Sequence, residues 1–339
     1  MVLHIPKVKR EHSIDYLGAL LLIASVVPIL LTLSVYGPEN GWGDSRTITY
    51  FVVGVIFGVL FFVQEKRAKE PILPLHLFEN HTFNLTSLLG AVIGAGMFGA
   101  IVMLPLYMQV VKGYSATSAG LKLIPMMLGI VSMSIYSGKT ISKHGHYKRF
   151  PVIGAVIMTF GILMMTRLEI DTPYWQVAIN AVLIGMGLGL SMQTIVIALQ
   201  NSVEMRDMGV ATSSNTFFRS LGSVFGTAFF GSVLTNRLAH YMQSGFADLA
   251  KSNPAAASAI DPSQMKSLAN NSTLIHQLPS DIQHVVLQAF VNSFHVVFYA
   301  AAPITALGFF LALMLKEVPL RTNADYQKAK EDAAGETLG

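Results

Sequence analysis

The sequence predicts an all-α membrane protein of about eight transmembrane helices. Two observations support this fold class. Hydrophobic residues make up 52% of the 339 residues and charged residues only 12%, whereas about a quarter of the residues in soluble domains are charged. The apolar residues also form long continuous runs, and a helix needs about 20 such residues to cross a bilayer. Because membrane barrels show short alternating strands instead, these runs favour a helical bundle.

Eight segments are long and apolar enough to span a bilayer. The predicted spans are Leu17–Tyr36, Thr47–Gln64, Asn84–Val111, Ala116–Gly138, Phe150–Thr166, Trp175–Gln200, Val210–Leu234 and Phe290–Leu315. No small-residue cleavage site follows the first run, so we interpret it as a retained helix and not as a signal peptide.

The connections between spans organise the chain further. Residues 70–83 contain Pro71 and Pro74 among scattered apolar residues, which predicts an interfacial elbow and not another span. Residues 236–289 are polar and predict a long external loop. The expected parts are two transmembrane helices with the elbow (1–83), a six-helix bundle (84–315) and a tail (316–339).

Lysine and arginine predict the orientation of the bundle. They cluster before the first span, after the second, between the fourth and fifth, and after the eighth. The positive-inside rule places these flanks in the cytoplasm, and an even number of spans then places both termini there. We therefore expect a multi-pass protein of the cytoplasmic membrane that is surrounded by the lipid bilayer.

Missing residues and motifs exclude several function classes. The chain has no cysteine, which excludes disulfides and thiolate metal sites. No zinc-protease, serine-hydrolase or phosphate-loop motif occurs, so we expect no enzyme, no cofactor and no metal. His144 and His146 form a pair, but the surrounding cations disfavour metal binding. The net charge of +4 lies on the helix flanks without a basic stripe, so we expect no nucleic-acid partner.

Few titratable residues lie within the spans. Arg219 lies nine residues into the seventh span, roughly 13 Å from its end, and this depth favours a role in gating or substrate contact. Lys122 lies near the outer end of its span, where its long stem can reach water by snorkelling. No acidic residue lies in a span. His295 is the one intramembrane candidate for proton coupling, and the alternative is a histidine held by a neighbouring backbone.

Small residues recur four positions apart on two spans, as Gly90 with Gly94 and Gly222 with Gly226. In lipid, this spacing lets helix backbones approach closely. The pairs indicate either static packing or helices that slide around a central cavity. Kinks are predicted at the prolines within two spans, Pro125 and Pro303.

Five segments in succession carry a family resemblance. They are IDYLGALLL and YGPENGWGD around the first span, EPILPLHLFENHTF in the elbow, YSATSAGLKLIPMMLG at the fourth span and GVATSSNTFFRSLGSVFGTAFFG at the seventh. Together, and in this order, they resemble the fourteen-span drug:proton antiporters of the major facilitator superfamily. The resemblance covers essentially the whole chain, but it concerns only the second part of such a transporter.

The resemblance implies multidrug efflux, in which amphipathic compounds are exchanged for protons by alternating access. The first two spans resemble the linker pair of the family, and the other six resemble its C-terminal bundle. The family's second copy of the cytoplasmic gating loop corresponds here to Gly138, Ser142, Lys143 and Gly145. Arg219 is a further gating candidate because of its depth in the span. Ser142 stands where the family has an acidic residue. The family's N-terminal half, with its membrane carboxylate, has no counterpart in this sequence.

Two functions remain open. The first is the C-terminal part of an exporter of amphipathic compounds, cationic ones among them, which is inactive without an N-terminal six-helix bundle or another chain. The candidate substrate-binding residues are Gln109, Lys122, Met126, Gln193, Asn215, Phe218 and Arg219. The second function is a nontransporting scaffold, or truncated relic, that associates with other bundles through its glycine faces.

Overall fold

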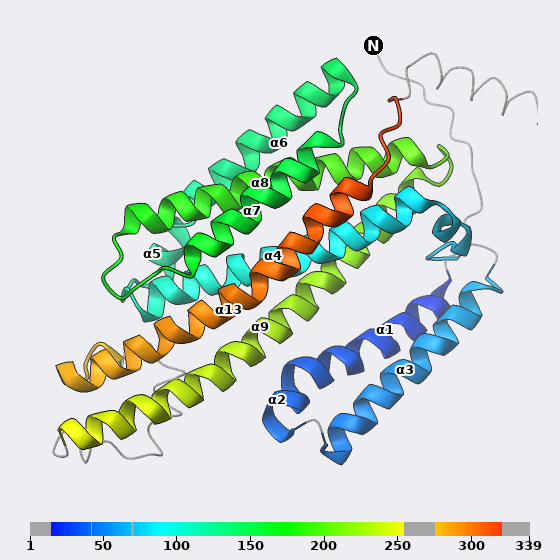
Figure 1. Cartoon of the computed structure of the whole chain (residues 1–339). Coiled ribbons are helices and arrows are strands. Elements are labelled where there is room, and N and C mark those ends of the chain that lie inside the picture. Colours follow the sequence, from blue (N-terminus) through cyan, green and yellow to red (C-terminus); the bar gives the residue numbers. More distant parts are fainter. Residues whose placement is uncertain (1–14, 42, 69–70, 254–274, 321–339) are drawn as a thin grey trace, which may run out of the picture. The chain divides into compact units, whose positions relative to one another are not determined.

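The computed structural model describes residues 15–41, 43–68, 71–253 and 275–320 (Figure 1). Within these ranges the chain forms helices and no strand. Helices lie in all eight predicted spans, which confirms the all-α fold class. The chain divides into two compact units, with the division between Glu79 and Asn80.

The first unit is a pair of apolar helices. Its elements are α1 (Tyr16–Leu31), the π-helical turn η1 (Thr32–Tyr36), α2 (Gly37–Asn40), α3 (Ser45–Glu65) and the 3₁₀-helix η2 (Leu75–Glu79). Gly54 lets α1 and α3 approach, and Ser25 Oγ donates a hydrogen bond to the Gly54 carbonyl at 2.8 Å. The π-helical turn begins four residues after Pro28, where Thr32 Oγ1 donates to the Pro28 carbonyl.

A buried carboxylate fixes the chain where it leaves α3. Glu65 is only 3% exposed, and its oxygens accept hydrogen bonds from the N–H groups of Ile72 and Leu73 at 3.3 and 3.0 Å. At the same end of the unit, Asp15 caps α1 by accepting from Gly18 N–H, and it also accepts from Gln64 Nε2. These bonds hold the start of the elbow against the helix pair.

The second unit is a bundle of longer helices. Its elements are α4 (His81–Val110), α5 (Ala116–Leu121), α6 (Ile124–His144), α7 (Arg149–Met165), α8 (Tyr174–Ser202), α9 (Met208–Ser252) and α13 (Ser280–Met314). Among the described residues of the chain, six helices are long and apolar enough to cross a membrane: α3, α4, α5 with α6, α8, α9 and α13. The apolar helices α1 and α7 are shorter.

The closest helix packing in the bundle is between α4 and α9. A Cβ atom added at Gly222 would overlap the carbonyl oxygen of Ala91, and one added at Gly226 would lie 2.7 Å from Ala95 Cα. Gly94 in turn lies against the backbone of Arg219. The small-residue spacing therefore does bring two helix backbones together, as the sequence predicted.

Glycines also let α8 pack tightly on both of its neighbours. Gly185 lies against the Met126 carbonyl of α6, and an added Cβ at Gly187 would lie 2.5 Å from the Gly154 carbonyl oxygen of α7. Helix α13 packs on α4, α7 and α9. The helices α4, α6, α8 and α9 thus form a connected series, in which α4 and α8 are the central pair.

The predicted kink at Pro125 is a full helix break. Helix α5 ends at Leu121 and α6 begins at Ile124. Proline has no N–H to donate to the carbonyl four residues earlier, and its ring clashes with that carbonyl. Pro303, by contrast, lies inside an uninterrupted α13.

The prediction of an external loop over residues 236–289 is wrong at both ends of this range. Helix α9 continues through Ser252 and α13 begins at Ser280. Leu238, Met242, Phe246 and Leu249 recur at helical spacing and are buried. They explain the extra turns, because they give the extension an apolar face. Residues 254–274, in the middle of that loop, lie outside the described residues.

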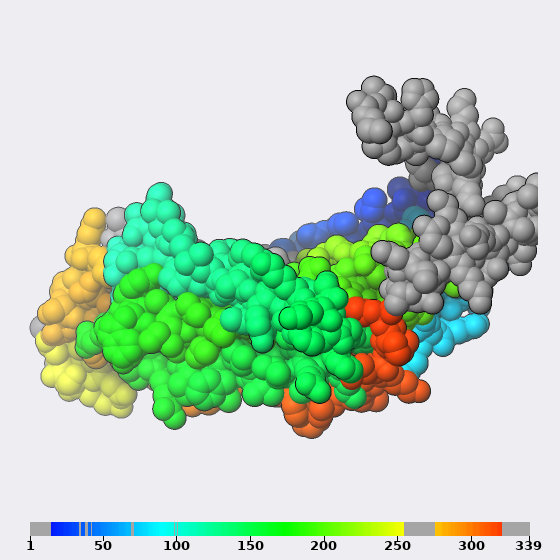
Figure 2. Space-filling model, turned by 90° about the horizontal axis from the view of Figure 1, so that it is seen from above, coloured from blue at the N-terminus to red at the C-terminus, as the bar shows by residue number. Residues whose placement is uncertain are grey.

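The two helix extensions pack on each other as an antiparallel pair. An added Cβ at Gly245 would lie 2.8 Å from Val285, and Ile282 and Val286 are buried. Figure 1 shows the extensions side by side, and in Figure 2 their yellow and orange atoms form one end of the bundle. With 45 residues, α9 is about 67 Å long, roughly twice the thickness of the hydrocarbon core.

Candidate functional site

An open groove of about 610 Å³ lies where α8 ends and α9 begins. Its lining residues are Gln200, Met208, Gly209, Thr212, Ser213 and Thr216. Gln200 Nε2 donates to Thr212 Oγ1 at 3.3 Å and links the two helices across the groove. The lining therefore offers amide and hydroxyl groups and a thioether, but no charge.

Hydroxyl groups continue from the groove along one side of α9. We call Thr212, Ser213, Thr216 and Ser220 the hydroxyl face. Thr212, Thr216 and Ser220 each donate to the carbonyl four residues earlier, at 2.7, 3.0 and 2.9 Å. Their oxygens can still accept hydrogen bonds, so this face is polar without being charged. This face is not among the predicted site residues, although the four-residue spacing of the hydroxyl side chains is visible in the sequence.

Arg219 follows the hydroxyl face into the membrane-spanning part of α9. It stands three residues after Thr216 and seven after Thr212, so the three residues share one side of the helix. Its backbone is fixed, because its carbonyl lies against Gly94 and accepts from Ser223 Oγ at 2.9 Å. The side chain is half-buried, and none of the ion pairs between described residues includes it.

Two other predicted substrate residues of α9, Asn215 and Phe218, differ in their contacts. Asn215 is only 2% exposed, and its Nδ2 donates to the Thr86 carbonyl of α4 at 2.8 Å. Phe218 meets Phe217 edge to face, with ring centroids 5.7 Å apart. Asn215 therefore faces α4 and not the groove.

The remaining predicted substrate residues are scattered. Gln109 is half-buried, and its Nε2 donates to the Pro105 carbonyl of its own helix. Gln193 is exposed on α8. Met126 is fully buried, with its carbonyl against Gly185. None of these three residues lines the groove between α8 and α9.

Lys122 lies between two aromatic rings at the break between α5 and α6. Its Nζ is 4.3 Å from the centroid of Tyr114 and 4.0 Å from that of Tyr174. Tyr174 also donates its hydroxyl to the Lys122 carbonyl at 3.1 Å. The ammonium is thus half-buried in a two-ring cage, and its reach to water by snorkelling stays a prediction.

Replacing Lys122 by methionine is expected to lower the free energy of unfolding by about 0.5–2 kcal/mol, because both cation–π contacts are lost. Thermal unfolding of the purified chain, followed by circular dichroism, measures this loss. Lys139→Met is the matched control, because Lys139 is exposed on α6. Equal stability of the two variants would show that the cage contributes nothing.

The connection between α7 and α8 is held by side chains from α4, from the turn after α4 and from α13. Tyr107 donates its hydroxyl to the Glu169 carbonyl at 2.8 Å, and Lys112 Nζ donates to the Ile170 carbonyl. His295 Nε2 lies 2.5 Å from the Leu168 carbonyl oxygen. These three carbonyls are consecutive in the sequence. His295 is therefore held by a neighbouring backbone, the alternative weighed from the sequence, and its role in proton coupling stays a prediction.

The predicted gating loop ends α6. Gly145 has φ = +76°, a conformation that glycine adopts without strain, and its N–H donates to the Ile141 carbonyl at 2.8 Å. Gly138 is half-buried in the last turns of α6, whereas Ser142 and Lys143 are exposed. Among the described residues, no hydrogen bond or ion pair joins either of these two side chains to an acidic residue.

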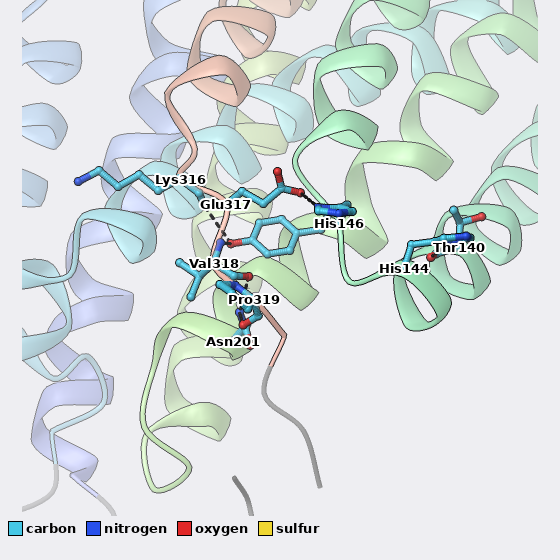
Figure 3. A network of polar contacts seen from close by, with 9 residues as sticks. Thr140, His144, His146, Asn201, Lys316, Glu317, Val318 and Pro319 are labelled. Carbon is cyan, nitrogen blue, oxygen red and sulfur yellow. Dashed lines mark hydrogen bonds and ion pairs between the residues drawn. The ribbon is translucent and has the colours of Figure 1, made fainter. Parts of the chain in front are cut away.

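The loop instead binds the segment after α13, residues 316–320, which we call the C-terminal strap (Figure 3). Tyr147 donates its hydroxyl to the Lys316 carbonyl at 2.9 Å and accepts from Val318 N–H at 3.1 Å. His146 Nδ1 lies 3.0 Å from Glu317 Oε1. Burial raises the pKa of Tyr147 above its ordinary value, and the hydrogen bond from Val318 opposes that shift.

The strap is held from a second side by α8. Asn201 Nδ2 donates to the carbonyls of Val318 and Pro319 at 3.2 and 3.1 Å (Figure 3). The strap therefore joins the ends of α6, α7, α8 and α13. Glu317 supplies an acidic group next to the loop, although the family's acidic position in the loop itself is Ser142.

The chain is similar to membrane transporters over most of its length. The family described as Major Facilitator Superfamily matches residues 15–227. An uncharacterised MFS-type transporter of Mycobacterium tuberculosis (strain ATCC 25618 / H37Rv) is 37% identical over 91% of this chain and 43% of its own. The multidrug transporter protein MdtP of Bacillus subtilis is 33% identical over 95% of this chain and 62% of its own. The chain therefore spans about half of these two relatives.

Two further matches differ in kind. A tetracycline resistance determinant of Streptomyces rimosus is 29% identical over 96% of this chain and 98% of its own, so the two are of similar length. Among solved structures, a bacterial homologue of the human lysosomal transporter Spinster, in an inward-facing and occupied conformation, matches with a TM-score of 0.52. At 15% identity, over 90% of this chain and 67% of that one, this match shows the fold alone.

Proposed function

Because the chain belongs to the major facilitator superfamily, we propose that it is the C-terminal part of an exporter of amphipathic compounds. In this proposal the second unit is one of two bundles that rock against each other, and proton uptake drives the exchange. A six-helix N-terminal bundle, on the same or another chain, completes the pathway. The protein is a multi-pass membrane transporter, and we place it in the cytoplasmic membrane.

The observation that carries this proposal is the polar side of α9. A helix that faces only lipid gains nothing from hydroxyl groups such as those of Thr212 and Thr216 at an open groove, whereas a helix beside a substrate path does. An arginine at the depth of Arg219 is costly unless it faces protein or water. Both features favour a water-filled path next to α9.

Length supports the proposal of a partial transporter. The mycobacterial and MdtP relatives extend well beyond the matched region, so each has a further segment that could supply the second bundle. The Streptomyces relative is as short as this chain and is named for tetracycline resistance. Because this relative has a similar length, transport by the chain alone is assayed first.

Reconstitution tests the proposal. Proteoliposomes with an imposed pH gradient would hold the chain alone, or the chain with the part of MdtP that it does not match. We expect dye export only from the pair, and only with the gradient. Proton-driven export by the chain alone would overturn the partial-transporter proposal. If the pair also fails to export, the nontransporting scaffold is the better function.

The absence of cysteine allows a direct test of the orientation. We expect an impermeant maleimide to label Ser252→Cys, at the end of the α9 extension, in intact cells. Ser142→Cys, at the end of α6, should react only after the cells are permeabilised. Both serines are exposed, so they form a matched pair. The opposite labelling pattern would place the termini outside the cytoplasm.

A further inference from the structure

We propose that Arg219 receives the anionic group of an amphipathic substrate, and that the hydroxyl face accepts hydrogen bonds from donor groups next to that anion. The inference rests on the proposed function, because it names the chemical class that the same path carries. It differs from the expectation in the sequence analysis, where the exported amphipathic compounds include cationic ones.

The charges along the path point to an anion. In the described parts of α4 to α9 and α13, acidic residues occur only in the helix extensions, as Asp248 and Asp281. The other described carboxylates of this unit lie in connections or in the strap. A cationic compound would therefore meet no opposite charge along these helices, whereas it would meet Arg219.

The position of Arg219 makes a partner necessary. Arg219 is the twelfth residue of α9, so it lies about 16 Å along the helix from Met208. A guanidinium at that depth is costly when it is neither paired nor hydrated. Its five N–H donors match a carboxylate in two parallel hydrogen bonds, and such charge-assisted bonds are about twice as strong as neutral ones.

The rest of the path suits a compound that carries donors of its own. Thr212, Thr216 and Ser220 already donate to backbone carbonyls, so their oxygens are the groups left to accept. Met208 adds an adaptable apolar contact at the groove. The expected ligand is an amphiphile with a carboxylate, or a similar anion, next to hydroxyl or amine groups.

The backbone under Arg219 keeps the guanidinium in place. The Arg219 carbonyl lies against Gly94 and accepts from Ser223, so α9 cannot rotate there without breaking the α4–α9 contact. A charge on a fixed backbone loses less entropy when it binds a ligand than a charge on a loop.

A matched pair of probes tests the inference on the full chain in phosphatidylcholine nanodiscs. Dansylaminoundecanoic acid and its methyl ester differ only in the anionic group. We expect the acid to bind about tenfold tighter than the ester, as hydrogen bonds to charged groups predict. Arg219→Gln should remove this preference while ester binding stays within about twofold. Arg219→Lys keeps the charge but not the two parallel hydrogen bonds, so it should retain part of the preference.

Three results would overturn the inference. One is an equal loss of acid and ester binding in Arg219→Gln, since that indicates packing and not charge recognition. The second is a trimethylammonium analogue that binds wild type as tightly as the acid, and this comparison holds even if Arg219→Gln fails to fold. The third is loss of acid binding when phosphatidylglycerol is added, because a lipid headgroup then occupies Arg219. Arg237→Gln, in the exposed extension of α9, is the control and should change nothing.

The proposed function can fail separately. Binding of the acid without export by the reconstituted pair would refute export and leave the anion site standing. Export of the ester and the trimethylammonium analogue, but not of the acid, would keep the exporter and refute the anion site. In the reconstituted pair, a carboxylate of the added MdtP part could pair with Arg219. The pair would then bind the acid no more tightly than the ester, and this result would also refute a substrate-receiving role for Arg219.

Discussion

Gly222→Ala is expected to lower the free energy of unfolding of the chain by about 1–3 kcal/mol, the usual cost of overpacking. Gly222→Leu should prevent the bundle from assembling. An added Cβ would overlap the carbonyl oxygen of Ala91 and come within 2.6 Å of its carbonyl carbon, so no side-chain movement can make room. Chemical unfolding in detergent micelles, followed by circular dichroism, measures the loss.

Gly231→Ala is the matched control, because it lies on the same helix with nothing within 4 Å of an added Cβ. Alanine forms helices better than glycine, so this variant should be neutral or slightly more stable. Ala91→Gly should not rescue Gly222→Ala, because the clash is with the backbone of Ala91 and not with its methyl group. Similar losses at positions 222 and 231 would show that the α4–α9 contact is not close packed.

Tyr147→Phe is expected to release the C-terminal strap. The buried hydroxyl both donates to the Lys316 carbonyl and accepts from Val318 N–H, so its loss leaves two backbone groups unpaired. Leaving such groups without partners costs about 1–3 kcal/mol. If cleavage follows local opening, trypsin should then cut after Lys316 about tenfold faster.

Two variants separate the hydroxyl from other contributions to the strap. Tyr136→Phe removes the hydroxyl of an exposed tyrosine that stacks edge to face on Phe150, and should leave cleavage unchanged. His146→Gln should have a small effect, because the His146–Glu317 pair is largely exposed and such pairs contribute about 0–1 kcal/mol. A larger effect of His146→Gln than of Tyr147→Phe would show that charge, and not the buried hydroxyl, holds the strap.

The sequence predicted what depends on local pattern. Long apolar runs predicted the positions of helices in all eight segments, six of them long enough to cross a membrane among the described residues, and the spacing of Gly222 and Gly226 predicted the close α4–α9 contact. The sequence also predicted a distortion of the helix at Pro125, because proline has no N–H to donate. The extension of α9 was missed because its apolar residues, such as Leu238 and Met242, share the helix with a polar face that lowers the average hydropathy.

The candidate site was predicted less well, because it depends on contacts between distant segments. Nothing near Tyr147 in the sequence indicates that it binds a backbone 169 residues away. Asn215 had the residue type and depth of a substrate ligand, yet only the position of Thr86 shows that its amide faces α4. Arg219 was identified because a charged residue inside an apolar run can be recognised from the sequence without knowledge of its neighbours in the fold.

Because α9 is long, a small tilt near its contact with α4 produces a larger displacement at its far end. The helix is held by α4 near Gly222 and Gly226, while its other end, at Ser252, lies about 40 Å farther along the axis. If the paired extensions of α9 and α13 tilt together by about 5° around that contact, Ser252 moves by roughly 3–4 Å on this geometry. Small adjustments beside Arg219 are thus magnified at the far tip, where a spin label or an antibody fragment can follow them from outside the bilayer.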